Sequence, residues 1–303
     1  AVVVNQLEKP SGSAPSLVRI ETIEPALVPT APSSPRIPLN VLIGVLGGLV
    51  LALAIAALRA VLDTRIHSSH DVESATDKPV LGGITLDPEA KKRPLIVHAD
   101  PRNPRAESFR SLRTNLQFID VDGDSRTFVI SSAGPSEGKS TTTANLAIAL
   151  AETGARVALV DGDLRLPRVA EYMGIEGSVG LTDVLIGRVD LADALQQWGN
   201  ERLFILPSGQ TPPNPSELLG SQAMQRTLEA MAGAFDYVLI DSPPLLLVTD
   251  AAVVSRFASG VLLVAASGIT RKPHLSAAVE RLEGIGSRLF GVIVTMLPTR
   301  GPD

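Results

Sequence analysis

The stretch 127-TFVISSAGPSEGKSTTTANLAIAL-150 contains the pattern that decides the fold. An apolar run at 128–130, typical of a buried strand, leads into a loop of small residues. The loop ends in Gly138-Lys139-Ser140, where an Ala- and Leu-rich helical pattern begins. Strand, loop, Gly-Lys-Ser and helix in this order predict a phosphate-binding loop, in which backbone N–H groups at the start of the helix point at phosphate oxygens.

The predicted loop gives each residue type a role. Gly138 lets the backbone approach a phosphate, Lys139 reaches the β- and γ-phosphates, and Ser140 binds Mg²⁺. The generic pattern begins with glycine, whereas this chain has Ala133 followed by Gly134. The residues expected to contact the nucleotide in this loop are Gly134, Pro135, Ser136, Glu137, Gly138, Lys139, Ser140 and Thr141.

The composition excludes several classes of protein. The 303 residues carry a net charge of −5, so no basic excess indicates nucleic acid as a partner. The chain has no cysteine, which excludes disulfides, cysteine-ligated metals and a thiol nucleophile. Its four histidines lack the spacing of a zinc site.

An uncharged run, VLIGVLGGLVLALAIAAL at 41–58, predicts one membrane-spanning helix. With its flanks, this helix is expected over 38–62. Residues 1–37 are rich in proline and serine, which favours an extended segment. Because ATP and Mg²⁺ are cytosolic, we expect the residues after 62 in the cytoplasm and the segment 1–37 outside it.

The rest of the chain alternates short apolar runs with amphipathic patterns. Residues 63–100 are expected to be a linker, and 101–303 a domain that carries the phosphate-binding loop. Further strands are predicted at 156–161, 203–206, 237–241, 261–266 and 289–295. Helices are predicted at 103–118, 216–231 and 273–282. This alternation predicts an α/β fold of the P-loop NTPase type, with a doubly wound, mainly parallel sheet, preceded by one transmembrane helix.

Two predicted strands end in aspartate. The run ALVDGDLR at 158–165 places Asp161 and Asp163 after one strand, and YVLID places Asp241 at the end of another. Carboxylates at this edge of a sheet hold Mg²⁺, directly or through water, or accept a proton from the attacking group. A lone aspartate at a strand end is otherwise a helix N-cap or a turn residue. Arg165 either steadies a phosphate or pairs with an acid.

Three charged residues follow a spacing of three within the predicted helix at 103–118. Glu107, Arg110 and Arg113 lie at i, i+3 and i+6. On this spacing alone they predict an exposed face with salt bridges.

Together these motifs resemble those of the bacterial tyrosine kinases of capsule and exopolysaccharide assembly, in the form fused to a chain-length-determinant membrane region. The loop at 133–140 is similar to the first nucleotide motif of that family, DGDLR at 161–165 to its Asp-x-Asp-x-Arg motif, and Asp241 to its third motif. Glu107, Arg110 and Arg113 match its Glu-x-x-Arg-x-x-Arg motif. The segments 31–40, 79–82 and 214–219 also look like that family.

The resemblance implies transfer of the γ-phosphoryl group of ATP to protein tyrosine, with Lys139, Asp161 and Asp163 as catalytic residues. It implies that Ser140, Asp161 and Asp241 organise Mg²⁺ and that Arg165 belongs to the nucleotide site. The division of metal contact and hydroxyl activation between the two aspartates at 161 and 163 stays open.

The resemblance also implies partners and a location. The Glu-x-x-Arg-x-x-Arg motif implies ring-like self-association, and the acceptors would be tyrosines of other proteins or of a neighbouring copy. The machinery of polysaccharide polymerisation and export would be a partner at the plasma (inner) membrane.

The chain departs from the family pattern in three places. The family's tail is rich in tyrosine, whereas the tyrosines here are Tyr172 and Tyr237. The first membrane helix and most of the external domain of the family are missing, so we expect a fragment. Val294-Thr295 stands where relatives often carry an asparagine that reads adenine.

Two alternatives stay open. One is a membrane-tethered ATPase of the septum-positioning or partition class, whose members carry a lysine where this chain has Gly134. The other is a chain-length regulator that binds ATP without transferring phosphate to tyrosine.

Overall fold

The computed structural model describes residues 32, 34–90, 92–119, 126–199 and 202–298. The chain forms two compact units, which divide between Leu62 and Asp63. The proline- and serine-rich segment expected over 1–37 lies almost wholly outside the described residues.

The first unit contains the apolar helix α2 (Ile37–Leu62). This helix corresponds to the one expected over 38–62. Among the described residues it is the one helix long and apolar enough to cross a membrane: the candidate span is the 23 residues Ile37–Arg59, within which an 18-residue window has a mean hydropathy of 2.8. At about 1.5 Å per residue these residues extend about 35 Å, which exceeds a hydrocarbon core of about 30 Å.

The second unit is an α/β domain. Its strands are β1 (Val80–Thr85), β2 (Thr127–Ser132), β3 (Val157–Asp161), β4 (Gln196–Trp198), β5 (Leu203–Leu206), β6 (Tyr237–Asp241), β7 (Gly260–Ala266) and β8 (Leu289–Leu297). Its helices are α3 (Ser69–Thr76), α4 (Ile96–Ala99), α5 (Pro104–Ile119), α6 (Lys139–Ala151), α7 (Val169–Met173), α8 (Leu181–Leu185), α9 (Leu191–Ala194), α10 (Pro215–Leu219), α11 (Gln222–Ala234), α12 (Asp250–Val254), the 3₁₀ helix η1 (Ser255–Phe257) and α13 (Lys272–Gly284).

The strands described in this unit form a single mainly parallel sheet in the order β1-β8-β7-β2-β6-β3-β5-β4. Only β4, which pairs with β5, runs antiparallel to its neighbour among the described strands. The predicted doubly wound, mainly parallel α/β fold is therefore confirmed, and so is each strand predicted from the sequence.

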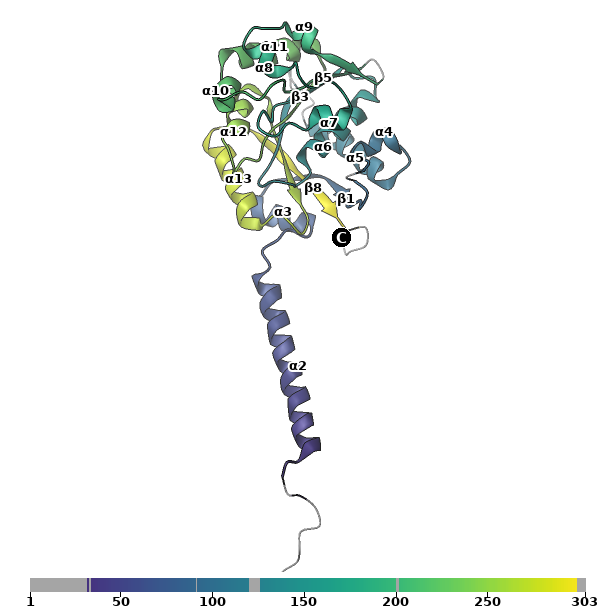
Figure 1. Cartoon of the computed structure of the whole chain (residues 1–303), viewed down its shortest axis with the longest axis vertical. Helices are drawn as coiled ribbons and strands as arrows, with labels where there is room; N and C mark the ends of the chain where they lie inside the picture. The colour runs from purple at the N-terminus through teal and green to yellow at the C-terminus, as the bar shows by residue number, and fades with distance from the viewer. Residues whose placement is uncertain (1–31, 33, 91, 120–125, 200–201, 299–303) are drawn as a thin grey trace, which may run out of the picture. The chain divides into compact units, whose positions relative to one another are not determined.

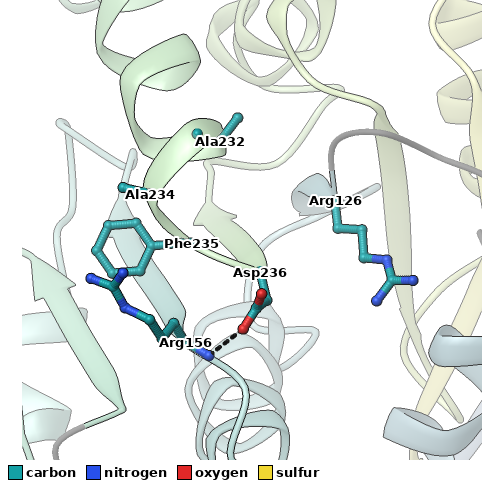
Figure 2. A pocket seen from close by; sticks show the side chains of 7 residues that line it. Arg126, Arg156, Ala232, Ala234, Phe235 and Asp236 are labelled. Atoms are coloured by element: carbon teal, nitrogen blue, oxygen red, sulfur yellow. Dashed lines mark hydrogen bonds between the residues drawn. The ribbon is translucent and has the colours of Figure 1, made fainter.

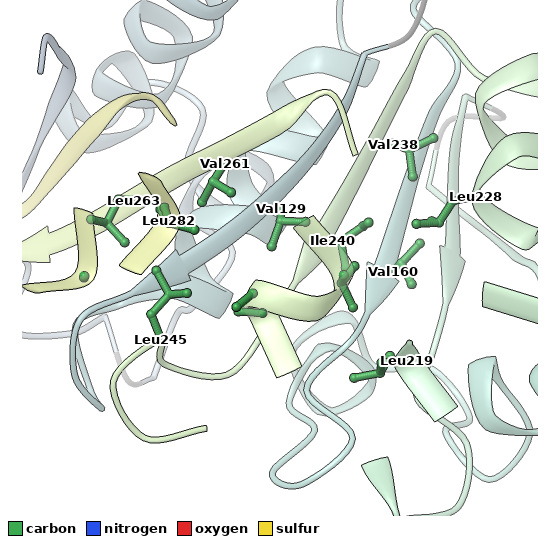
Figure 3. Close-up of a cluster of buried hydrophobic side chains, with 14 of the residues drawn as sticks. Val129, Val160, Leu219, Leu228, Val238, Ile240, Leu245, Val261, Leu263 and Leu282 are labelled. Carbon is green, nitrogen blue, oxygen red and sulfur yellow. The ribbon is translucent and has the colours of Figure 1, made fainter. Parts of the chain in front are cut away.

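Helices cover both faces of the sheet (Figure 1). Along β2, Val129 packs into one apolar cluster, whereas Phe128 and Ile130 pack into the other, because successive side chains point to opposite faces. Figure 3 shows the first cluster, where Leu228 of α11 and Leu282 of α13 pack against the strands. Helices α4 to α7 contribute to the second cluster. This burial on two faces explains why the strands are continuous apolar runs.

The structure differs from the linker expected over 63–100. This range carries α3, which packs against α13, and β1, which pairs with β8 at the edge of the sheet. Leu81 and Ile84 of β1 are 2 % and 1 % exposed. Gly82 lies against Leu112 and Gly83 against Leu297, so that an added Cβ at either glycine would be crowded. The segment is part of the domain because it buries apolar side chains and completes the sheet.

A second difference concerns the helix predicted over 216–231. The structure has two helices there, α10 and α11. The break follows Gly220, and the Ser221 hydroxyl caps α11 by accepting the backbone N–H of Met224 at 3.2 Å. Helical periodicity continues through the break, which is why the pattern reads as one helix.

Gly162 allows the ends of β3 and β6 to lie close together. Asp161 and Asp241 are register partners in this parallel pair, and the Gly162 backbone N–H donates to the Asp241 carbonyl at 2.7 Å. A Cβ at position 162 would lie 2.8 Å from that carbonyl oxygen and 2.9 Å from Ile240 Cγ2. Any side chain here must therefore move one of the two strand ends.

We expect Gly162→Ala to lower the free energy of unfolding by about 1–3 kcal/mol, because the methyl group overpacks two backbone segments. Gly233→Ala in α11 is the matched control: no atom lies within 4 Å of its added Cβ, and alanine favours the helix by about 0.5–1 kcal/mol. Urea denaturation of the purified chain measures both. Equal shifts of the two midpoints would contradict this account of Gly162.

Candidate active site

The phosphate-binding loop and both aspartate-bearing strand ends meet at one edge of the sheet. β6 lies between β2 and β3, and all three are parallel, so their carboxyl ends share this edge. A cavity of about 660 Å³ opens here. The predicted nucleotide-site residues that line it are Pro135, Ser136, Gly138, Lys139, Ser140, Thr141 and Asp163.

The loop has an unusual backbone before α6. Ser136 and Gly138 have φ angles of 61° and 87°, both in the left-handed region. Glycine adopts this conformation without steric cost, whereas a serine stores strain of about 1 kcal/mol or more. Left-handed residues in a loop turn successive N–H groups toward one side, which makes a concave anion-binding surface. The conformation therefore suits a phosphate at the start of α6, as the sequence predicted.

Lys139 lies among the carboxylates of the site. Its Nζ is 3.0 Å from Asp163 Oδ2 and 3.4 Å from Ser140 Oγ. Burial alone would lower the pKa of Lys139, but Asp241 and Asp163 outweigh burial and raise it. The lysine is therefore held as a cation at the point where phosphates would enter.

Asp161 has a structural task as well as its place in the site. Its Oδ1 accepts the backbone N–H of Asp163 at 3.3 Å, and its Oδ2 accepts those of Arg168 and Val169 at 3.2 and 3.0 Å. These bonds shape the turn that leads into α7. Of the helix-cap and turn roles considered for a lone aspartate, Asp161 takes the turn role, since the N-cap of α7 is Arg168, while Asp163 faces the cavity.

Asp241 is completely buried, and its Oδ2 has no hydrogen-bond partner among the described residues. Burial raises its pKa, and Lys139 opposes this. Thr143 Oγ1 is 3.5 Å from Asp241 Oδ1. A buried carboxylate with an unsatisfied oxygen, beside the Ser140 hydroxyl, is the oxygen-rich environment that Mg²⁺ prefers, so these residues fit the predicted metal.

The two strand-end carboxylates repel one another. Burial raises the pKa of Asp161 from its ordinary value of 3.8 to about 7, and Asp241 adds to the shift. The N–H donor of Val169 opposes it. The ligand-free site therefore holds neighbouring carboxylates at the ends of adjacent strands and has too little positive charge to neutralise them.

Arg165 does not contact the cavity. It pairs with Asp250 of α12, with Nε to Oδ2 at 2.8 Å and Nη2 to Oδ1 at 3.1 Å. Nη2 also donates to Ser216 Oγ at 3.3 Å. Of the two roles considered for Arg165, the structure realises pairing with an acid, and it places this predicted nucleotide-site residue outside the cavity lining.

Other predicted loop residues also lie off the cavity. Gly134 does not line it, and the side chain of Glu137 is 3 % exposed and bonds Thr270 instead. Thr295, at the position where relatives often have an adenine-reading asparagine, lines the cavity and donates to the Glu137 carbonyl at 2.7 Å.

Several residues that line the cavity were not predicted. They come from three segments without a nucleotide motif: the region from β1 to the start of α5, the stretch from 166 through α7, and the loop after β6. They include Leu86, Asp87, Pro94, Arg105, Leu166, Arg168, Tyr172 and Leu247. Only Tyr172 stood out in the sequence, because it is one of only two tyrosines in the chain.

A second hollow, of about 400 Å³, lies at the amino ends of β3 and β6 and is shown in Figure 2. Its arginines are engaged: Arg156 stacks on Phe235 at 5.3 Å, and Arg126 stacks on Tyr237 at 5.1 Å. The backbone N–H of Arg156 donates to Asp236 Oδ2 at 2.7 Å. Its wall includes the C-terminal end of α11, whose dipole disfavours anions. This hollow is therefore a poor phosphate site.

The motif residues of α5 make contacts within the chain. Arg110 is 3.1 Å from Glu107 and 3.7 Å from Glu152, which follows α6. Arg113 Nη1 donates to the Ala149 carbonyl at 3.2 Å. The side chain of Glu107 is 68 % exposed. Of the exposed salt-bridged face predicted from the spacing, the Glu107–Arg110 pair is present, and the Glu107 carboxylate is still exposed. Arg113 is half-buried and bonds a backbone carbonyl, so it is not part of that face.

Comparisons with known proteins identify the family of the chain. The family model described as an AAA domain matches residues 126–267. The tyrosine-protein kinase YwqD of Bacillus subtilis is 40% identical over 203 residues, which are 67% of this chain and 86% of that protein. The chain belongs to the bacterial tyrosine-kinase family. This confirms the resemblance found in the sequence motifs.

Longer and structural matches support the same family. The tyrosine-protein kinase etk of Escherichia coli is 28% identical over 312 residues, which cover 96% of this kinase chain but 43% of that protein. The solved tyrosine kinase domain of BceF matches with a TM-score of 0.71 at 35% identity, and the match covers 77% of this kinase chain and 100% of that domain.

We expect Asp241→Asn to stabilise the ligand-free kinase by roughly 1 kcal/mol at pH 7.5. Folded Asp161 keeps its proton to about pH 7, whereas an ordinary aspartate loses it near 3.8. The folded state therefore binds the extra proton in this window, and the stability that the proton gives is lost as pH rises through it. Without the charge of Asp241, the pKa of Asp161 falls and this loss shrinks.

Denaturation at pH 5 and pH 7.5, without Mg²⁺ or nucleotide, checks the sign. Asp250→Asn is the matched control, because this buried aspartate is paired with Arg165 and its loss should destabilise by about 2 kcal/mol. Shifts of both variants in the same direction would overturn the charge argument.

Proposed function

We propose that the chain transfers the γ-phosphoryl group of ATP to tyrosine hydroxyl groups of proteins. The observation that carries the proposal is the Lys139–Asp163 ion pair, which places a second carboxylate at the mouth of the phosphate-binding loop. A kinase needs a group that accepts the proton of the acceptor hydroxyl, in addition to the groups that bind phosphate and metal. The named activity of the relatives YwqD and etk supports the same reaction.

Each residue of the site has a proposed role. Lys139 neutralises charge on the β- and γ-phosphates. Ser140 and Asp241 hold Mg²⁺, with Asp161 beside them, and the bound ion supplies positive charge to the phosphate oxygens. Asp163 accepts the proton of the tyrosine hydroxyl, because it lines the cavity, whereas both oxygens of Asp161 accept backbone N–H groups.

A phosphate that binds Lys139 competes with Asp163 for the same ammonium group. The ion pair is 3.0 Å long in the ligand-free chain. When the ammonium group turns to the phosphate, the carboxylate of Asp163 loses its strongest partner and becomes available to a hydroxyl. Binding of ATP thereby prepares the base for the acceptor.

The location is part of the proposal. We place α2 across the plasma (inner) membrane and the unit that begins at Asp63 in the cytoplasm, where ATP is available. The resemblance to capsule and exopolysaccharide kinases supports a role in polysaccharide chain-length control and export, with the polymerisation and export machinery as partners.

The test supplies the purified chain with ATP, Mg²⁺ and a tyrosine peptide. We expect phosphotyrosine to form, and Lys139→Ala to reduce the rate by about 100-fold or more, because a charge-stabilising donor at the phosphates is lost. Lys78→Ala is the matched control, because Lys78 pairs with Glu283 away from the cavity. Phosphotyrosine counted by mass spectrometry is the readout.

Two outcomes of this assay separate the alternatives. Labelling that survives Lys139→Ala would remove the site assignment. Release of ADP and phosphate without phosphotyrosine would favour a tethered ATPase or a chain-length regulator that only binds and hydrolyses ATP.

We also propose that Glu107, Arg110 and Arg113 form an interface between copies in a ring-like oligomer. The carboxylate of Glu107 supports this, because it pairs with Arg110 and is still exposed to contact a second copy. We expect Glu107→Lys to shift the chain toward monomers in sedimentation velocity, whereas Glu229→Lys, on the exposed face of α11, does not. Unchanged sedimentation of Glu107→Lys would exclude this interface.

A further inference from the structure

The side chain of Glu137 turns inward from the phosphate-binding loop. Its Oε1 accepts the hydroxyl of Thr270 at 2.7 Å, and the same hydroxyl accepts the backbone N–H of Ala266 at 2.8 Å. Glu137 and Thr270 are 3 % and 2 % exposed. The Thr270 hydroxyl, which donates one hydrogen bond and accepts another, therefore connects the loop after β2 to the loop between β7 and α13.

The backbone of Glu137 is held from a second element. The hydroxyl of Thr295, in β8, donates to the Glu137 carbonyl at 2.7 Å. The backbone N–H groups of Ala133 and Gly134 favour the charged form of the Glu137 carboxyl and so oppose the rise of its pKa. Glu137 is thus held by hydrogen bonds from β8 and from the loop after β7.

This residue sits between the two left-handed positions of the loop, of which Ser136 is strained. Ser136 and Gly138 flank it, and both have positive φ angles. A loop in such a conformation relaxes unless its surroundings fix it. Keeping a carboxyl group here is itself unfavourable, since burial raises the pKa of Glu137 to about 7 and its Oε2 has no partner among the described residues. An apolar residue would pack at lower cost, which points to a task in holding the loop.

We propose that Glu137 and Thr270 are positioning residues, whose hydrogen bond holds the phosphate-binding loop in the shape that binds nucleotide. The inference rests on the nucleotide-dependent function proposed above. It extends that function to Thr270, which lies outside every nucleotide motif. Neither side chain lines the cavity, so both act through the backbone of the loop.

The experiment measures binding of a fluorescent ATP analogue with Mg²⁺ to the purified full chain. Thr270→Val keeps the shape of the side chain and removes the hydroxyl, so we expect the dissociation constant to rise about tenfold, as for the loss of a hydrogen bond to a charged group. Thr270→Ser restores the hydroxyl and should bind within about twofold of the wild type. In the kinase assay the KM for ATP should rise with Thr270→Val while kcat changes less than about threefold.

Thr227→Val is the matched control. Thr227 is also a buried threonine, but its hydroxyl donates within α11 to the Ala223 carbonyl at 2.9 Å. It should lower the melting temperature without changing nucleotide binding. Equal loss of binding in both valine variants, or unchanged binding in Thr270→Val, would overturn the inference.

A second pair of variants covers the case in which Thr270→Val does not fold. Glu137→Gln keeps an acceptor oxygen for Thr270 and should bind nucleotide within about threefold of the wild type, whereas Glu137→Ala should lose about tenfold or more. Equal binding by these two variants would also contradict the inference. A wild-type chain that does not bind the analogue would instead contradict the nucleotide function itself.

Discussion

The charge balance around Lys139 is the interaction on which the site depends. Its ammonium group pairs with Asp163 at 3.0 Å, and Asp161 and Asp241 lie buried close by. The sheet imposes this crowding, because β3 and β6 are parallel neighbours and both end in aspartate. Burial raises the pKa of both buried carboxyls, and repulsion adds to each shift, from Asp241 on Asp161 and from Asp163 on Asp241. The fold thus holds several carboxylates together, which is unfavourable in free energy. Such an arrangement is found where a bound ligand supplies the missing positive charge.

The sheet could be predicted from the sequence wherever a strand is a continuous apolar run, as in β2, β3, β5, β6, β7 and β8. The other two strands lack that signal. β1 has Gly82 and Gly83 at its centre, and β4 is the three residues Gln196–Trp198. Both exist because a neighbouring strand supplies backbone hydrogen bonds, and a local pattern does not contain this information. The same limit applies at Gly220, where helical periodicity continues across a break between two helices.

The site could be predicted where its chemistry is local in the sequence. Lys139 and Asp163 were found from short motifs, and the structure brings them together. The partner of Arg165 could not be predicted, because Asp250 lies 85 residues further along the chain. The bond from Thr270 to Glu137 joins residues 133 positions apart. Motifs therefore located the groups that face the ligand, whereas the contacts that orient them depend on tertiary structure.

The pairing of β1 with β8 has a consequence for how the chain is made. Among the described strands, β1 precedes the others in the chain and its neighbour β8 follows them, more than 200 residues later, so β1 is synthesised well before its partner. Contacts between such distant segments form slowly, and an unpaired strand is prone to wrong pairing while it waits. Helix α3 lies between α2 and β1 in the chain. Of the described strands, β1 therefore waits longest for a partner, and it is the strand that needs protection in that interval.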